Sequence, residues 1–348
     1  MCTCPNYLIP IGTHVDKNMQ EKTTYKFLGH QQWKALKQMN QDDPLMLLPF
    51  VEVPCNQCLE CRIQYARRWA DRCVLEAKKY KYNYFVTLTY DDAFLPNRNS
   101  LEPKDLQLFI KRLRKHYAKK YPDLKIRFLA SGEYGDKSWR PHYHIILFNC
   151  PIDDLTYVFE RKEVVDYDLT TGKPIFGPYM KVNLEGNKKD MLYSKTIYEL
   201  WHCQGNISVQ AFNYDTAAYV SQYVTKKCNP ANQHIYEELK IYPEFLRMSN
   251  RPGIGAQYFH DHDDEDLFLR KIIIPQDGEA HLSAVPRYYD KLFIKKYGEE
   301  VFSPIRLKRV RDKLQNLNTS ISTKKDKDSE RRIKDYNLKK IHHLREGI

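Results

Sequence analysis

The stretch RPHYHIILF, residues 140–148, decides the fold. In a β-strand successive side chains point to opposite faces, so His142 and His144 share one face with Phe148, and the other face is apolar. Two imidazoles that point the same way can bind one cation. A pair of histidines on a strand is by itself also compatible with hydrogen-bonded core residues, so the neighbouring segments carry the argument.

The segments before this strand predict a sheet with a helix on one of its faces. NYFVTLTYDD (83–92) alternates as a strand does, and KIRFLASGEYG (125–135) predicts a second strand that ends in a glycine-bearing turn. Residues 140–148 then return as its antiparallel neighbour. Between the first two strands, residues 102–122 predict an amphipathic helix, with Pro103 in its first turn. The apolar stripe of this helix consists of Leu106, Phe109, Ile110, Leu113 and Tyr117. The order strand, helix, strand, strand predicts an α+β fold.

The predicted hairpin also supplies a carboxylate to the two histidines. Glu133 ends the strand that pairs with the histidine strand, so its side chain can reach the face of His142 and His144. Two imidazoles and one carboxylate leave coordination positions open on a divalent ion, as a catalytic site requires. The carboxylate keeps Mg²⁺ and Mn²⁺ as candidates.

A second helix, predicted over residues 213–227, carries two tyrosines on one face. Tyr219 and Tyr223 lie four residues apart, and Lys226 follows one turn later. A phenol with a pKa near 10 is a poor nucleophile at neutral pH, but a nearby ammonium or a metal-bound phosphate favours the phenolate. Considered alone, two such tyrosines are most often packing residues.

Five cysteines gather near the N-terminus. Cys55, Cys58 and Cys61 form a C-x2-C-x2-C pattern at the start of a predicted helix, and Cys2 and Cys4 could fold back onto them. A structural Zn²⁺, an iron–sulfur cluster and three reduced thiols all remain open on spacing alone. Cys73 lies on the apolar stripe of that helix and is expected to be a core thiol.

Charge and composition favour an anionic partner. The chain of 348 residues has a formal net charge of +12 and 26 tyrosines, which suits nucleic acid with bases stacked on aromatic rings. From Arg306 to Ile348, 14 Lys and Arg stand against six Asp and Glu, so eight of the twelve net charges lie there. This tail is expected to be a marginal helix or disordered. No apolar run is long enough to span a bilayer and no signal peptide is evident, so a soluble, unsecreted protein without a membrane partner is expected.

In this order, the motifs resemble the HUH endonucleases of rolling-circle replication, and within them the replication initiators of microviruses of the gokushovirus branch. YFVTLTY (84–90) matches the family's first strand motif, RPHYHIILF its histidine motif and YVSQYVTKK (219–227) its two-tyrosine motif. PCNQCLECR (54–62), SNRPGIG (249–255) and VPRYYDK (285–291) look like further signatures of that branch.

The resemblance implies a central antiparallel sheet flanked by helices, with the tyrosine helix lying across the site. It implies His142, His144 and Glu133 as metal ligands, Tyr219 and Tyr223 as nucleophiles, and Lys226 at the scissile phosphate or the phenolate. Arg140 and Lys227 are candidate phosphate contacts, although Arg140 could equally anchor its own loop. The expected organisation is a Cys-containing helical segment (1–80), a nickase core (81–229) with an insertion at about 151–205, an extension packed on the core (230–303) and a basic tail (304–348).

The function expected from these observations is that of a replication initiator. It would nick and rejoin single-stranded origin DNA of a small circular phage genome through a 5′-phosphotyrosine, in the cytoplasm of a bacterial host and together with the host replication machinery. Two alternatives remain open: a non-catalytic protein that binds single-stranded DNA, and a metal-dependent phosphoesterase that uses water as its nucleophile.

Overall fold

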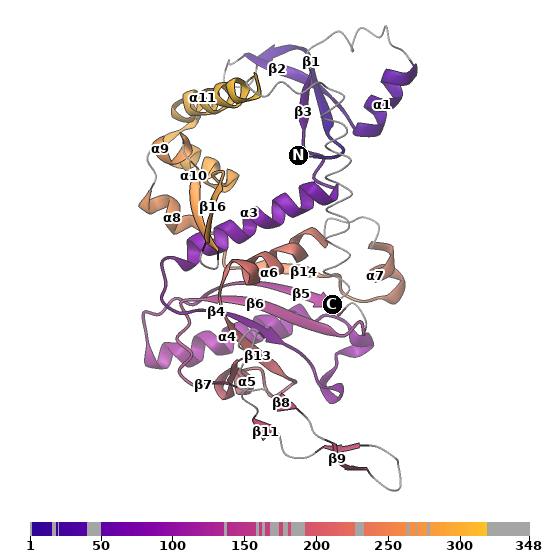
Figure 1. Ribbon diagram of the computed structural model, residues 1–348, viewed down its shortest axis with the longest axis vertical. Coiled ribbons are helices and arrows are strands. Elements are labelled where there is room, and N and C mark those ends of the chain that lie inside the picture. The colour runs from indigo at the N-terminus through magenta and orange to yellow at the C-terminus, as the bar shows by residue number, and fades with distance from the viewer. Residues whose placement is uncertain are drawn as a thin grey trace. The chain divides into compact units, whose positions relative to one another are not determined.

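The computed structural model describes most of the chain (Figure 1). The described residues are 2–15, 19, 21–39, 50–135, 138–157, 160–161, 164–167, 174–176, 180–181, 192–226, 233–262, 265–269, 271–276 and 279–318. They fall into two compact units. One holds the described residues up to Tyr65 together with those from Val310 on, and the other runs from Ala66 to Arg309.

The larger unit is built on a seven-stranded sheet in which every neighbouring pair is antiparallel (Figure 1). The strand order is β14-β5-β6-β4-β13-β12-β7. The strands are β4 (Asn83–Leu88), β5 (Arg127–Tyr134), β6 (Pro141–Phe148), β7 (Leu155–Tyr157), β12 (Leu192–Ser194), β13 (Ile207–Ala211) and β14 (Phe245–Met248). The predicted α+β class with a central antiparallel sheet is therefore confirmed.

The histidine strand β6 lies in the interior of this sheet, between β5 and β4. The predicted hairpin of β5 and β6 is confirmed, and its register sets Glu133 opposite His142. On the other side of β6, His144 lies opposite Thr87 of β4. Since β6 has a hydrogen-bonded neighbour on each side, the positions of its side chains are fixed by two ladders.

One face of the sheet is covered by α4 (Pro103–Lys120), the helix predicted from the stripe at residues 102–122. Glu102 caps it by accepting a hydrogen bond from the Lys104 N–H at 3.1 Å, and Pro103 occupies its first turn. All five predicted stripe residues are buried, against a sheet face that includes Ile145 and Leu147. Burying one such leucine or phenylalanine contributes about 1.5–3 kcal/mol.

The opposite face packs against α6 (Tyr214–Lys226) and against the part of α3 (Leu59–Ala77) that follows residue 65. Ile146 and Phe148 of β6 point into this second core, so the two histidines of β6 lie on the same face. Cys73 of α3 is fully buried in it, as the stripe predicted. Figure 1 shows α6 on this side of the sheet, across β5 and β6, and α4 on the other.

Shorter elements complete the larger unit. Helices and 3₁₀ turns are Asp92–Phe94, Asn97–Asn99, α5 (Lys195–Leu200), α7 (Gln233–Leu239), α8 (Ala256–Asp261), α9 (Glu265–Leu269), α10 (Arg287–Tyr297) and the start of α11 (Glu299–Asn318). Two-stranded sheets are formed by β8 (Glu160–Arg161) with β11 (Met180–Lys181), β9 (Val164–Tyr167) with β10 (Pro174–Phe176), and β15 (Ile272–Gln276) with β16 (Glu279–Ser283). The β9–β10 pair lies where the sequence predicts a hairpin excursion in the insertion.

The N-terminal unit contains a three-stranded sheet in addition to the predicted helical segment. The strands β1 (Asn6–Val15), β2 (Glu21–Leu28) and β3 (Val51–Val53) pair in the order β2-β1-β3, and α1 (His30–Met39) packs beside them. Its buried apolar cluster is small and consists of Tyr7, Ile9 and Trp33. Of the predicted basic tail at residues 304–348, α11 covers the part up to Asn318, and the rest lies outside the described residues.

Among the helices that the structure describes, none is both long and apolar enough to cross a membrane.

Candidate functional site

The three predicted metal ligands meet on one face of the sheet. One ligand atom from each of Glu133, His142 and His144 lies within 4.8 Å of the other two. The Glu133 Oε1 is 2.7 Å from the Nε2 of His144 and 3.4 Å from the Nε2 of His142. The imidazole planes stand nearly perpendicular, at 85°. Both rings thus present Nε2 to the same carboxylate oxygen.

Strand register brings these groups together. Glu133 and His142 are directly opposed on β5 and β6, and His144 follows two residues later on the same face. The cluster lies toward the end of the sheet where β5 finishes and β6 begins.

Hydrogen bonds orient both imidazoles. The Nδ1 of His142 lies 3.1 Å from the carbonyl oxygen of Arg140, and because a carbonyl only accepts, Nδ1 must carry the hydrogen. The Nδ1 of His144 is 2.9 Å from the Thr87 hydroxyl, which can donate or accept. In His142 the Nε2 lone pair is therefore available to a cation, and such contacts to the second nitrogen are typical of metal-ligating histidines.

The carboxylate at the centre is held in its charged form. Glu133 is 1% exposed, and this burial raises its pKa, but the hydrogen bonds from His142 and His144 outweigh that effect and lower it to about 2. A buried anion that faces two imidazoles through their Nε2 atoms is a suitable environment for a divalent cation, which would take the place of the imidazolium protons.

Tyr219 of α6 lies against this cluster. Its ring is 5.0 Å from that of His144, edge to face at 85°, and it also contacts Phe85 of β4 at 6.1 Å. Phe85 stacks on His144 from the strand next to it, with ring centroids 5.3 Å apart. The side chain of Tyr219 nevertheless remains 41% exposed. The predicted meeting of the histidine strand and the tyrosine helix on one face thus holds for Tyr219.

The second tyrosine lies on the same helix. The backbone of Tyr223 and Lys226 belongs to α6, one turn and two turns beyond Tyr219. The side chains of Tyr223 and Lys226, and all of Lys227, lie outside the described residues.

Arg140 anchors the turn that precedes the histidine strand. Its guanidinium forms an ion pair with Asp92 and donates to the carbonyl oxygen of Tyr90 at 2.7 Å. The side chain is 38% exposed, so one side of the guanidinium faces solvent. Of the two roles that the sequence leaves open, the loop anchor is the one for which these contacts exist.

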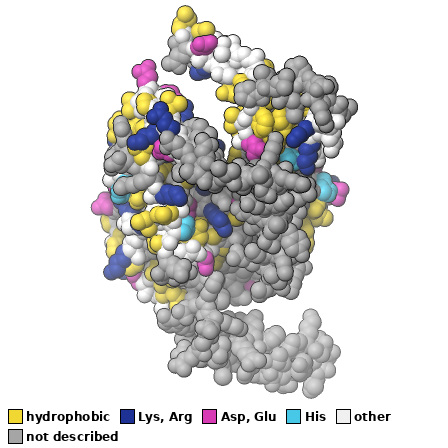
Figure 2. All heavy atoms as spheres, turned by 45° about the horizontal axis from the view of Figure 1, so that its top comes forward, with side chains coloured by type: hydrophobic (Ala, Val, Ile, Leu, Met, Phe, Trp, Pro, Cys, Tyr) yellow, Lys and Arg dark blue, Asp and Glu magenta, His cyan; other side chains and the backbone are white. Residues whose placement is uncertain are grey.

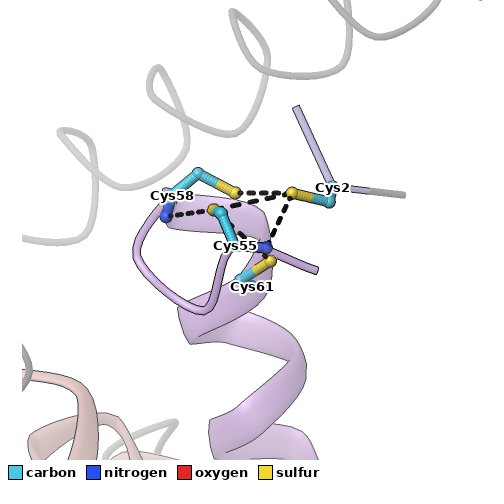
Figure 3. Close-up of side chains that lie close together, drawn as sticks. All are labelled: Cys2, Cys55, Cys58 and Cys61. Carbon is cyan, nitrogen blue, oxygen red and sulfur yellow. Dashed lines mark hydrogen bonds between the residues drawn. The ribbon is translucent and has the colours of Figure 1, made fainter. Parts of the chain in front are cut away.

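The cysteine motif forms a second cluster, in the N-terminal unit. The sulfurs of the predicted Cys55, Cys58 and Cys61 gather together with that of Cys2 (Figure 3). The hydrogen bond with Cys2 lowers the pKa of the Cys58 thiol to about 3. Cys4 does not join them, and its sulfur lies 3.8 Å from the Thr3 hydroxyl.

Positive charge is distributed among apolar side chains. Figure 2 shows one face of the molecule, on which the described lysine and arginine side chains form several separate groups among hydrophobic ones. On this face, the described basic residues do not form one continuous field.

Two neighbours of the histidines were missed by sequence reasoning, namely Thr87 and Phe85. Their alternation in YFVTLTY places both on one face of β4, but only the register between β4 and β6 sets Thr87 opposite His144. The fourth cysteine of the N-terminal cluster was likewise not distinguishable from Cys4 on spacing.

Comparison with known proteins agrees with this site. The sequence profile of the replication-associated protein ORF2 family matches residues 83–228, the segment that contains β4 to α6. A replication-associated protein, ORF2, of Spiroplasma virus 4 is 33% identical over 255 residues, which cover 72% of this chain and 70% of that protein. The replication-associated protein VP4 of Bdellovibrio phage phiMH2K is 29% identical, over 71% of this chain and 69% of that protein.

A third relative, the replication-associated protein ORF4 of Chlamydia phage 1, is 28% identical over 71% of this chain and 55% of its own length. No solved structure matches the chain significantly. An α+β unit with a Glu–His–His cluster beside a tyrosine helix, within the segment that the family profile matches, defines the class of protein. The chain belongs to the replication-associated proteins of microviruses, as the motif resemblance implied.

Proposed function

We propose that this protein starts and ends rolling-circle replication by nicking and rejoining single-stranded origin DNA through a 5′-phosphotyrosine. One observation carries the proposal: an exposed tyrosine, Tyr219, packs at 5.0 Å on His144, which belongs to the Glu133–His142–His144 cluster. A phosphodiester seated at this cluster would lie within reach of the phenol, which is the proximity that a nucleophilic attack needs.

The cluster suits a divalent cation, and we assign it Mg²⁺ or Mn²⁺, held by the Glu133 carboxylate and the Nε2 atoms of His142 and His144. Three ligands leave positions open for a phosphate oxygen. When bound, such an ion supplies charge stabilisation to a phosphoryl group. The residues around it keep the ligands in place: Thr87 holds His144, and the Arg140 carbonyl holds His142.

The reaction is a transesterification. The Oη of a tyrosine attacks phosphorus, a P–Oη bond forms, and the bond between phosphorus and the 3′ oxygen breaks. The proton leaves the phenol and the 3′ oxygen takes one up, so the products are a 5′-phosphotyrosine and a free 3′-hydroxyl. A host polymerase can extend that hydroxyl. Attack by a 3′-hydroxyl on the phosphotyrosine reverses the step and reseals the strand without nucleotide hydrolysis.

Two tyrosines on one helix face would allow the enzyme to alternate. With Tyr219 and Tyr223 one turn apart, one can hold the old 5′ end while the other cuts the regenerated origin. Lys226 would stabilise the phenolate or contact the scissile phosphate, and Lys227 and the solvent-facing side of Arg140 would contact the DNA backbone.

The test is a covalent-adduct assay. Purified protein, Mn²⁺ and a labelled single-stranded oligonucleotide that spans the origin should give a protein–DNA adduct that survives denaturing electrophoresis. The Tyr219→Phe, Tyr223→Phe double variant should form none. Tyr242→Phe is a matched control because Tyr242 is 40% exposed and its ring packs on Phe245, away from the cluster.

The two alternatives give different outcomes in the same assay. A water-using phosphoesterase would cleave the oligonucleotide in the double variant and leave no adduct with the wild type. A non-catalytic DNA-binding protein would retain the oligonucleotide on a native gel but neither cleave nor trap it. Either result would refute the tyrosine mechanism.

A further inference from the structure

The four sulfurs of Cys2, Cys55, Cys58 and Cys61 form a compact group in the N-terminal unit (Figure 3). The Cys2 sulfur is 3.5 Å from that of Cys55 and 3.7 Å from that of Cys58, and the sulfurs of Cys55 and Cys61 are 3.9 Å apart. All four lie within 4.8 Å of one another. This cluster is separate from the Glu133 site, which belongs to the other unit.

These distances match four ligands around one ion. Zn–S bonds of about 2.3 Å at the tetrahedral angle put the ligand sulfurs about 3.8 Å apart. A disulfide needs about 2.05 Å, so the sulfurs are too far apart for one, and all four cysteines are free. An iron–sulfur cluster spreads its cysteine ligands around several iron atoms, whereas here the four sulfurs surround a single point.

Backbone N–H groups point at the sulfurs in a way that suits thiolates. The N–H groups of Gln57 and Cys58 both donate to the Cys55 sulfur, at 3.4 and 3.2 Å. The N–H of Cys55 donates to the Cys2 sulfur at 3.4 Å. The positive φ of Asn56, 60°, allows the tight turn between Cys55 and Cys58. Donors aimed at sulfur favour its charged form, which is the form that binds metal.

The start of α3 adds to this effect. The Cys58 carbonyl accepts the first hydrogen bond of the helix, from Arg62 N–H at 3.0 Å, and Cys61 lies in its first turn. Negative charge is stabilised at a helix N-terminus, because the peptide dipoles and the unpaired N–H groups of the first turn face it.

We propose that Cys2, Cys55, Cys58 and Cys61 hold one structural Zn²⁺ that joins the N-terminus to the start of α3. All four coordination positions are filled by protein sulfur, which is the closed arrangement of structural rather than catalytic zinc. Soft thiolate ligands in tetrahedral geometry select this ion over Mg²⁺ or Ca²⁺.

The N-terminal unit is one that needs such a link. Its buried apolar cluster consists of Tyr7, Ile9 and Trp33, and several large apolar side chains of β1 and β2, including Ile11 and Phe27, are exposed. Small units of this kind are commonly stabilised by metals or disulfides. The ion would cross-link Cys2 to residues 53 to 59 positions away and so close the chain around β1, α1 and β3.

The first test uses the unaltered full chain. Brief treatment with iodoacetamide, followed by peptide mass spectrometry, should modify the exposed Cys203 and also Cys4, and should leave the four clustered thiols unmodified. Removing zinc with a strong chelator before treatment should make all four reactive at once. Native mass spectrometry of the same sample should show one zinc per chain.

The second test separates this site from the Glu133 cluster and from Cys4. Zinc content is measured in a His142→Ala, His144→Ala background, alone and with Cys58→Ser or Cys4→Ser added. We expect one zinc per chain in the background and with Cys4→Ser, and a loss of at least ten-fold in zinc affinity with Cys58→Ser. Cobalt added to the metal-free protein should give the visible absorption of a tetrahedral tetrathiolate site.

Three results would overturn the proposal. The first is equal alkylation of clustered and unclustered thiols in zinc-containing buffer. The second is a zinc content that falls as much with Cys4→Ser as with Cys58→Ser. The third is iron in place of zinc in protein purified under reducing conditions, which would show as visible absorption before any cobalt is added.

Discussion

Thr87→Val removes the hydroxyl that holds His144 while nearly conserving the volume of the side chain. That hydroxyl lies 2.9 Å from Nδ1 of an imidazole that is 7% exposed, so the substitution leaves a nearly buried nitrogen without its partner. Such a loss costs about 1–3 kcal/mol. Groups that orient metal-ligating histidines contribute about 10–100-fold to metal affinity, which corresponds to about 1.4–2.7 kcal/mol.

The variant should therefore need more metal but, once loaded, react almost as fast as the wild type. We expect the Mn²⁺ concentration that gives half-maximal adduct formation to rise about 10–100-fold, with little change in the rate at saturation. Direct Mn²⁺ binding, measured by electron paramagnetic resonance, should weaken by the same factor. Thr87→Ser keeps the hydroxyl and should restore most of the affinity.

A matched control lies two residues along the chain. Thr89→Val removes a hydroxyl that donates to the Asn206 carbonyl at 2.8 Å, a contact of similar length that touches neither histidine. It should leave the Mn²⁺ dependence unchanged. The reasoning is refuted if Thr87→Val keeps the wild-type Mn²⁺ affinity, or if Thr89→Val weakens it equally.

Three further predictions concern stability and can be checked by urea unfolding. Glu76→Gln should cost about 3–5 kcal/mol, because it leaves the buried Arg127 guanidinium without its anion; a loss below 1 kcal/mol would contradict this. Leu113→Ala should cost about 2–5 kcal/mol, because Leu113 is fully buried under the sheet, and an unchanged midpoint would show that α4 does not pack there. Burial raises the pKa of Asp154, but hydrogen bonds from Ser194 and the Thr196 N–H outweigh it and lower that pKa. Asp154→Asn should therefore cost less than about 1 kcal/mol at pH 7, and this difference should disappear as the pH falls below about 3.9, toward the lower folded-state pKa.

Local patterns were sufficient for the elements of the core. The stripe at residues 102–122 predicted α4 and all five of its buried residues, because a 3.6-residue period is a property of the chain alone. The alternation in β6 placed both histidines on one face, and the glycine-bearing turn predicted their pairing with the Glu133 strand. The short strands β1, β2 and β3 did not stand out, because their exposed faces carry apolar side chains as well.

The sequence by itself determined which residues could ligate a metal, since residue chemistry and strand period are local. The tertiary structure decided which of them meet. Pairing of β4 with β6 sets Thr87 against His144, packing of α6 on the sheet brings Tyr219 to that ring, and the turn before β1 brings Cys2 rather than Cys4 to the other cysteines. These contacts join residues 53 to 75 positions apart, and their geometry depends on strand register and helix packing, which a one-dimensional pattern does not contain.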